Sequence, residues 1–161
     1  MLKIRQATSA DLNELSAVYA SVYRDFKTGE DWTEEAAYKL LEHYLKNQPD
    51  LAFLAEENGK LIGGFLAAIK PWYDGNHLFD GEIFVVTAFQ KKGVGTLLAK
   101  EMFRVSLEKY QAVAWDAYTF SSFEHPLKWY KSLGFEVCPG LVMFSGNIED
   151  ALDKINRKLL N

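Results

Sequence analysis

The stretch from residue 81 to residue 110 constrains the fold of this chain most, because it joins a strand, a glycine turn and a helix without interruption. The apolar, β-branched run at residues 83–86 is typical of a buried strand. From Val94 onward, apolar residues recur at the three- and four-residue spacing of an amphipathic helix. The turn between them contains Gly93 and Gly95. This order predicts a strand and a helix packed together in an α/β fold.

The turn has the properties of an anion-binding site. The first N–H groups of a helix lack carbonyl partners and lie at the positive end of the helix dipole, so phosphate oxygens bind there readily. Gly93 and Gly95 have no Cβ and let a diphosphate come close to the backbone. Lys91 and Lys92 add positive charge beside them. The turn therefore predicts a site for a small phosphorylated ligand.

The spacing of the glycines excludes two common phosphate-binding loops. A dinucleotide fingerprint requires a third small residue where this chain has Leu98, and a P-loop requires a Gly-Lys-Ser/Thr sequence that this turn lacks. What remains is Gln-x-x-Gly-x-Gly, starting at Gln90 directly after the strand. An ordinary glycine-rich turn without a ligand is the alternative interpretation.

Gln-x-x-Gly-x-Gly resembles the coenzyme A loop of the GNAT superfamily of N-acetyltransferases, which surrounds the cofactor's pyrophosphate. A second signature agrees, because Tyr130, Gly134 and Phe135 match the Tyr-x-x-x-Gly-Phe pattern of that family. In the family this tyrosine frequently lies beside the thioester sulfur. The resemblance covers residues 2–145. This chain departs from common family residues at Thr87, Phe123 and Pro126.

The order of the other elements is similar to that of the family. A strand at residues 2–6 precedes two amphipathic helices, and Asn58-Gly59 between two apolar runs predicts a hairpin. After the motif helix we expect a strand at 112–118, a helix at 126–133 and strands at 135–138 and 141–145. We therefore expect a GNAT-type α/β (α+β) fold, with a mixed, mostly antiparallel central sheet flanked by helices.

We expect one GNAT-like acetyltransferase domain over residues 1–161. Its core should cover about residues 2–145, and an extra C-terminal helix should follow at about 147–160.

Composition limits the partners of this chain. A net charge of −4 argues against nucleic acid. No apolar stretch is long enough to span a membrane, and the N-terminus lacks a signal-peptide core. The single cysteine, Cys138, excludes an internal disulfide and fits a reducing compartment, so we expect a cytoplasmic protein. We expect Cys138 to be a buried small side chain, and the scattered histidines predict no metal site.

The resemblance implies direct transfer of the acetyl group of acetyl-CoA (acetyl-coenzyme A) to a primary amine of a small molecule or peptide. This reaction needs an acid for the thiolate, a donor for the oxyanion and a base for the amine. Tyr130 is the candidate acid, with a core tyrosine as the alternative. Glu82 is the candidate base, with a solvated carboxylate as the alternative. His77, His125 and water are other candidates for the base.

The other site residues form two sets. We expect the end of the motif strand and the turn to bind the cofactor, with the N–H of Val85 or Val86 directed to its carbonyl. The cofactor set is Val85, Val86, Thr87, Gln90, Lys91, Lys92, Gly93, Val94, Gly95 and Thr96. Aromatic walls beside acidic loops suit a cationic amine, although such loops can also serve only solubility. The acceptor set is Phe26, Trp32, Trp72, Tyr73 and Tyr118.

Two further functions compete with the enzyme. A GNAT-fold module could bind an acyl-CoA as a sensor or as an inactive regulatory module. A homodimeric structural or regulatory protein could use its C-terminal amphipathic helix as an interface. The intact turn at residues 90–96 together with Tyr130 favours the enzyme, because a sensor does not need the acid.

Overall fold

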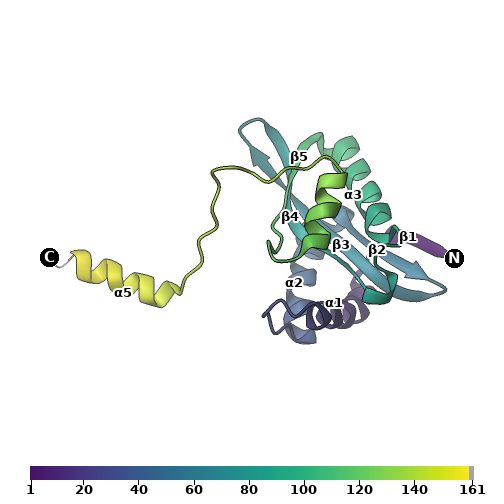
Figure 1. The fold of residues 1–161 in the computed structure, drawn as a ribbon, viewed down its shortest axis with the longest axis horizontal. Coiled ribbons are helices and arrows are strands. Elements are labelled where there is room, and N and C mark those ends of the chain that lie inside the picture. The colour runs from purple at the N-terminus through teal and green to yellow at the C-terminus, as the bar shows by residue number, and fades with distance from the viewer. Residues whose placement is uncertain (160–161) are drawn as a thin grey trace. The chain divides into compact units, whose positions relative to one another are not determined.

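The computed structural model describes residues 1–159, which form one compact unit over residues 1–120 and a second that starts at Ser121 (Figure 1). The strands of the first unit are β1 (Leu2–Gln6), β2 (Ala52–Glu57), β3 (Lys60–Trp72), β4 (Gly75–Val85) and β5 (Ala112–Asp116). Its α-helices are α1 (Leu12–Phe26), α2 (Glu34–Asn47) and α3 (Val94–Tyr110). Short 3-10 helices lie at Ser9–Asp11, Pro49–Leu51 and Thr87–Phe89.

The described strands form one sheet in the order β1-β2-β3-β4-β5. Neighbouring strands are antiparallel except for β4 and β5, which are parallel. The β4–β5 ladder pairs only residues Asn76 to Phe79 of β4, although β4 continues to Val85. The last part of β4 therefore extends beyond the described ladder with β5.

Helices cover both faces of this sheet: α1 and α2 lie on one face and α3 on the other (Figure 1). The two-residue alternation of strand side chains supplies both cores. The face under α1 and α2 buries Leu15, Leu41, Leu54, Leu66 and Phe84 in one cluster. On the α3 face, Trp115 packs against Phe65 and Phe103. Burying one such side chain contributes about 1.5–3 kcal/mol.

The predicted Asn-Gly hairpin joins β2 to β3, as expected. Asn58 and Gly59 have φ values of 52° and 77°, which is the pair of positive φ angles that a two-residue I′ turn requires. The next connection is a second tight hairpin, because β3 runs to Trp72 and β4 begins at Gly75. Residues 70–72 pair with residues 75–77 in this hairpin.

The second unit contains α4 (Glu124–Ser132) and α5 (Ile148–Leu159). The strands expected at 135–138 and 141–145 are wrong, because these residues have no regular secondary structure. A strand needs a neighbouring strand for its N–H and C=O groups, and among the described residues this unit contains none. Cys138 is exposed, so its expected burial is also wrong. Helix α5 agrees with the expected C-terminal helix, whose last residue, position 160, lies outside the described residues.

None of the helices in the described part of the chain is both long and apolar enough to cross a membrane.

A charged cluster joins β1, β2 and the start of α1. The Arg5 guanidinium donates to Asp11 through Nη2 at 2.7 Å and Nη1 at 3.0 Å, and Nη2 also donates to Glu56 at 2.6 Å. The hydrogen bonds from Arg5 hold the pKa of Asp11 well below its ordinary value. A carboxyl with a lowered folded-state pKa stabilises the fold above its unfolded pKa, and this contribution falls as the pH falls.

Asp11→Asn should therefore lower the free energy of unfolding by about 2 kcal/mol at pH 7, because a charge-assisted, bidentate pair is lost. The difference from the wild type should shrink below about pH 4, where unfolded aspartate takes up its proton. Urea denaturation at pH 7 and pH 3 measures both values. Glu35→Gln, at the exposed pair with Lys39, is the control and should change stability little. A loss at Asp11 that is the same at both pH values would contradict this assignment.

Candidate active site

A β-bulge in β4 orients Glu82. Leu66 pairs with Glu82 and Ala68 with Phe79, so that Ala67 faces both Asp80 and Gly81. Asp80 and Gly81 have φ values of 51° and 99°. A Cβ on Gly81 would lie 2.6 Å from the Cβ of Ala67, so only glycine fits this position. Bulges of this kind re-aim the side chain that follows them, which here is Glu82.

Two phenols of α1 bind the Glu82 carboxylate. The hydroxyls of Tyr19 and Tyr23 donate to Oε2 at 2.8 and 3.1 Å. The two rings stack with their centroids 4.5 Å apart, and Trp32 packs edge-on against both rings. Glu82 therefore lies half-buried against an aromatic wall.

Burial raises the pKa of Glu82 above its ordinary value, and the nearby carboxylates of Asp80 and Glu30 raise it further. The hydrogen bonds from Tyr19 and Tyr23 act in the opposite direction. Burial also raises the pKa of Asp80. A carboxylate with a raised pKa binds a proton more strongly, which is the property that a general base acting near neutral pH needs.

The two backbone donors expected for the cofactor, the N–H groups of Val85 and Val86, face opposite sides of β4. The N–H of Val86 donates to the carbonyl of Ile62 on β3 at 2.9 Å. Because an antiparallel ladder alternates, Val85 directs its N–H and C=O away from β3, on the side where the described β5 ladder has ended. The Val85 carbonyl accepts a hydrogen bond from Nε2 of Gln90 at 2.8 Å. The N–H of Val85 is therefore the better placed of the two donors.

The glycine turn leaves open space at the start of α3. Gly93, with φ 84°, is the N-cap residue, and Lys91 also has a positive φ of 59°. A Cβ added to Gly93 or Gly95 would meet no atom within 4 Å. Buried Val94 anchors the first turn of the helix, where Thr96 also lies, and Nζ of Lys92 lies 5.4 Å from the centre of the Phe89 ring.

Helix α1 also contacts the segment before this turn. Oγ1 of Thr87 donates to the Asp25 carboxylate at 2.9 Å. Asp25 lies two residues after Tyr23, so one helix contacts both the Glu82 carboxylate and the segment that leads into the turn.

The structure brings part of the expected acceptor set together. Trp32 lies beside the phenols that bind Glu82, and Phe26 is partly buried against the same core. Tyr118 is exposed and packs edge-on against Phe79, where the β4–β5 ladder ends. Trp72 and Tyr73 lie at the tip of the β3–β4 hairpin. At about 3.3 Å per residue, this tip is roughly 20 Å along β3 from the position opposite Glu82.

His77, an alternative candidate base, is buried between two carboxylates. Its Nδ1 lies 2.6 Å from Asp116 and its Nε2 lies 2.8 Å from Asp74. The hydrogen bond with Asp116 is the main cause that raises the pKa of His77. Both ring nitrogens are occupied, so His77 joins β4 to its neighbours and has no nitrogen directed to a substrate. No group of side chains in residues 1–159 has the arrangement of a metal site.

Tyr130 lies in the second unit, on α4. Its ring packs against Trp129 and Phe135, with centroids 5.1 and 6.5 Å away. Its carbonyl accepts from the N–H groups of Leu133 and Phe135, at the turn where Gly134 has φ 88°. His125 belongs to the first turn of the same helix.

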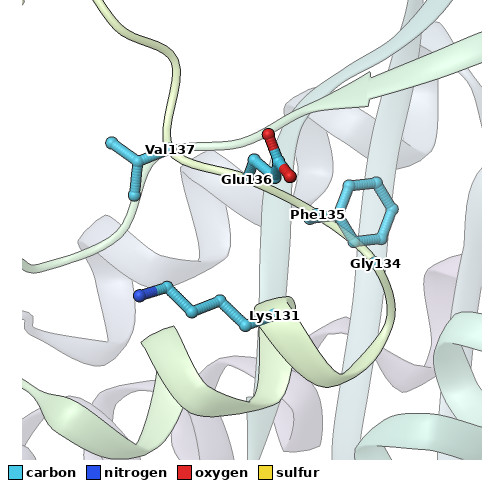
Figure 2. A pocket seen from close by; sticks show the side chains of 5 residues that line it. All are labelled: Lys131, Gly134, Phe135, Glu136 and Val137. Atoms are coloured by element: carbon cyan, nitrogen blue, oxygen red, sulfur yellow. The ribbon is translucent and has the colours of Figure 1, made fainter.

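A pocket of about 380 Å³ lies between the end of α4 and the chain that follows it (Figure 2). It is lined by Lys131, Gly134, Phe135, Glu136 and Val137. None of the residues expected to bind the cofactor or the acceptor lines this pocket.

A protein-family model identifies the family to which the chain belongs. The model of the acetyltransferase (GNAT) family matches residues 14–135. The chain belongs to the GNAT family. This confirms the resemblance to the GNAT superfamily that the two signatures indicate.

One curated relative is similar to most of this chain. An uncharacterised N-acetyltransferase of Methanocaldococcus jannaschii is 26% identical over 137 residues, which are 83% of this chain and 60% of that protein. The chain thus spans about 60% of the length of this curated relative.

Solved structures share the fold. The aminoglycoside N-acetyltransferase AAC(6')-Iy in complex with CoA has a TM-score of 0.71 and 22% identity, covering 91% of this chain and 95% of that one. A possible acetyltransferase from Clostridium difficile 630 has a TM-score of 0.74 and 15% identity, covering 91% and 97%. The mixed, mostly antiparallel GNAT-type sheet expected from the sequence is confirmed.

Gly81→Ala should lower the free energy of unfolding by about 2–4 kcal/mol, because a Cβ both strains a positive φ and overlaps Ala67. Gly59→Ala is the matched control, since φ is 77° there and a Cβ meets nothing within 4 Å. It should cost only about 1 kcal/mol of backbone strain. Urea denaturation measures both losses, and equal losses would show that Ala67 does not constrain the bulge.

Proposed function

We propose that this GNAT protein is an acetyl-CoA-dependent N-acetyltransferase that transfers the acetyl group directly to a primary amine of a small molecule or peptide. One observation carries the proposal. The bulge in β4 places the half-buried Glu82 carboxylate three residues before Val85, whose backbone faces the side where β4 has left β5. A base and an edge for the acyl donor thus lie on the same short stretch of strand.

The residues of the first unit fit coenzyme A. The pantetheine arm can pair with the end of β4 as an added strand, with the N–H of Val85 directed to the thioester carbonyl. The pyrophosphate fits the start of α3, where a Cβ on Gly93 or Gly95 would meet only open space. Lys91 and Lys92 supply positive charge beside it. The similar AAC(6')-Iy, solved with CoA, supports this use of the fold.

The reaction needs two proton transfers, and this chain offers a group for each. Glu82 takes a proton from the attacking amine, directly or through a water molecule, as the nitrogen forms its bond to the carbonyl carbon. The bond between carbon and sulfur then breaks, and Tyr130 gives a proton to the leaving thiolate. Bound acetyl-CoA supplies only the activated acetyl group.

The acceptor site should lie beside the aromatic wall. Trp32 offers a flat apolar surface beside the phenols that bind Glu82, and Phe26 is partly buried against the same core. Tyr118 offers a second surface against Phe79, and the carboxylates of Asp80 and Glu82 favour a cationic amine. The aminoglycoside acceptors named for AAC(6')-Iy support a small polar amine. We also propose that both units belong to one domain, because the family match crosses from one to the other.

A sensor or inactive module that only binds acyl-CoA is the second candidate, since the same turn and strand edge would serve it. Calorimetric titration with acetyl-CoA tests whether the cofactor binds, and thiol release with a panel of amines tests turnover. Binding without thiol release would favour the sensor.

Gly95→Leu should weaken acetyl-CoA binding at least 100-fold, because its side chain would fill the space left for the pyrophosphate. Gly95 lies inside α3, where replacing glycine does not strain the helix, so the thermal midpoint should not fall. Calorimetric titration gives the affinity, and Gly95→Ala provides a smaller step. An unchanged dissociation constant for Gly95→Leu would refute the cofactor turn.

Tyr130→Phe should lower kcat about 100-fold, within the range for loss of a general acid, while the affinity for acetyl-CoA changes little. Because the ring stays, its packing on Trp129 and Phe135 is retained. Steady-state thiol release and titration with CoA measure the two effects separately. Equal kcat values would remove Tyr130 as the acid.

A further inference from the structure

Resting on the proposed function, we propose that Tyr19 and Tyr23 are a positioning pair for Glu82: they bind Oε2 and leave Oε1 to take the proton of the amine. Both phenols donate to the same oxygen. Among residues 1–159, no hydrogen bond to the other oxygen is found, and the side chain is only half-buried. The carboxylate therefore has one fixed oxygen and one oxygen available to an acceptor.

The pair is held rigidly. Tyr19 and Tyr23 are four residues apart on α1, so their side chains lie on the same face one turn apart. Tyr19 is fully buried, and its ring contacts Tyr23, Trp32 and Phe84 with centroids 4.5, 5.1 and 5.1 Å away. Such packing leaves the phenols little freedom to turn away, and it fixes the direction of the Glu82 carboxylate.

The surroundings of Glu82, apart from the two phenols, disfavour its ionised form. Asp80 on the same strand and Glu30 in the loop before α2 repel a negative charge at Glu82, and burial disfavours it as well. On α2, the hydroxyl of Tyr44 interacts with Asp80. Tyr19 and Tyr23 are the groups that favour the ionised form of Glu82. Burial and the negative charge of Glu82 also raise the pKa of both tyrosines, so they stay protonated and can donate to the carboxylate.

The chemical consequence concerns the pH range of the base. A base must be ionised to accept a proton, so kcat/KM falls as the pH drops through the pKa of Glu82. The two hydrogen bonds lower this pKa while burial raises it. Without the phenols, Glu82 would remain protonated to a higher pH. The pair thus keeps a strongly proton-binding carboxylate ionised when the amine arrives.

The test replaces each phenol by the ring alone. Tyr19→Phe and Tyr23→Phe should each raise the pKa of Glu82 by about one pH unit, because each variant removes one hydrogen bond to the charged Glu82 carboxylate. The side-chain carboxyl ¹³C resonance reports this pKa by NMR titration in protein without substrate, and Glu82→Gln assigns the signal. The acidic limb of kcat/KM should move to higher pH by the same amount, and activity should recover above it.

Tyr38→Phe is the matched control. Tyr38 on α2 is partly buried against the same core, and within residues 1–159 the hydrogen bonds to Glu82 come from Tyr19 and Tyr23, so this variant should change neither the carboxyl titration nor the pH profile. An unchanged pKa of Glu82 in both Tyr19→Phe and Tyr23→Phe would overturn the inference. A shifted pKa with an unmoved acidic limb would overturn the positioning role in catalysis.

Failure of the proposed function itself would look different. It would show as no thiol release with any amine in the wild type, whereas the NMR titration would still decide whether the phenols hold the carboxylate. A shift there would support the contact, and no shift would overturn it.

Discussion

The separation of β4 from β5 after Phe79 is the constraint on which the rest of the site depends. A strand that leaves its neighbour exposes backbone N–H and C=O groups that must find other partners. At the point of separation, Nε1 of Trp115 donates to the carbonyl of Asp80 at 3.0 Å, so one of these groups is bound by the protein itself. Further along, Gln90 binds the carbonyl of Val85. The backbone N–H groups on this edge of β4 can then bind an extended ligand that pairs with the strand.

Helix α1 connects the two halves of the proposed chemistry. It presents Tyr19 and Tyr23 to Glu82, and two residues after Tyr23 the Asp25 carboxylate binds Thr87 before the glycine turn. A small movement of α1 would therefore affect both Glu82 and the segment that leads into the glycine turn. Thr87 stands where proline is common in the family, and here its hydroxyl makes a contact that proline could not make.

Local rules predicted much of this fold. The Asn58-Gly59 turn, the helix start at Gly93 and the position of Glu82 on the motif strand all follow from short-range chemistry. The bulge at Asp80–Gly81 does not, because it depends on how Ala67 of another strand faces two residues at once. The spacing of residues does not identify the two phenols beside Glu82 either, since core and functional tyrosines on a helix have the same pattern. The strands expected beyond Gly134 were wrong because strand pairing, which local sequence does not determine, decides whether they form.

The energetic cost of keeping a carboxylate at Glu82 also indicates that this residue has a function. Placing a half-buried carboxylate near Asp80 and Glu30 opposes folding, because burial and like charges both disfavour its ionised form. An apolar residue between Phe84 and the α1 face would pack there without that cost. Instead, the chain keeps the carboxylate and surrounds it with two phenol donors and an aromatic wall. Proteins break their folding rules in this way where chemistry requires it, and here the exception lies three residues before Val85, on the part of β4 that extends beyond its ladder with β5.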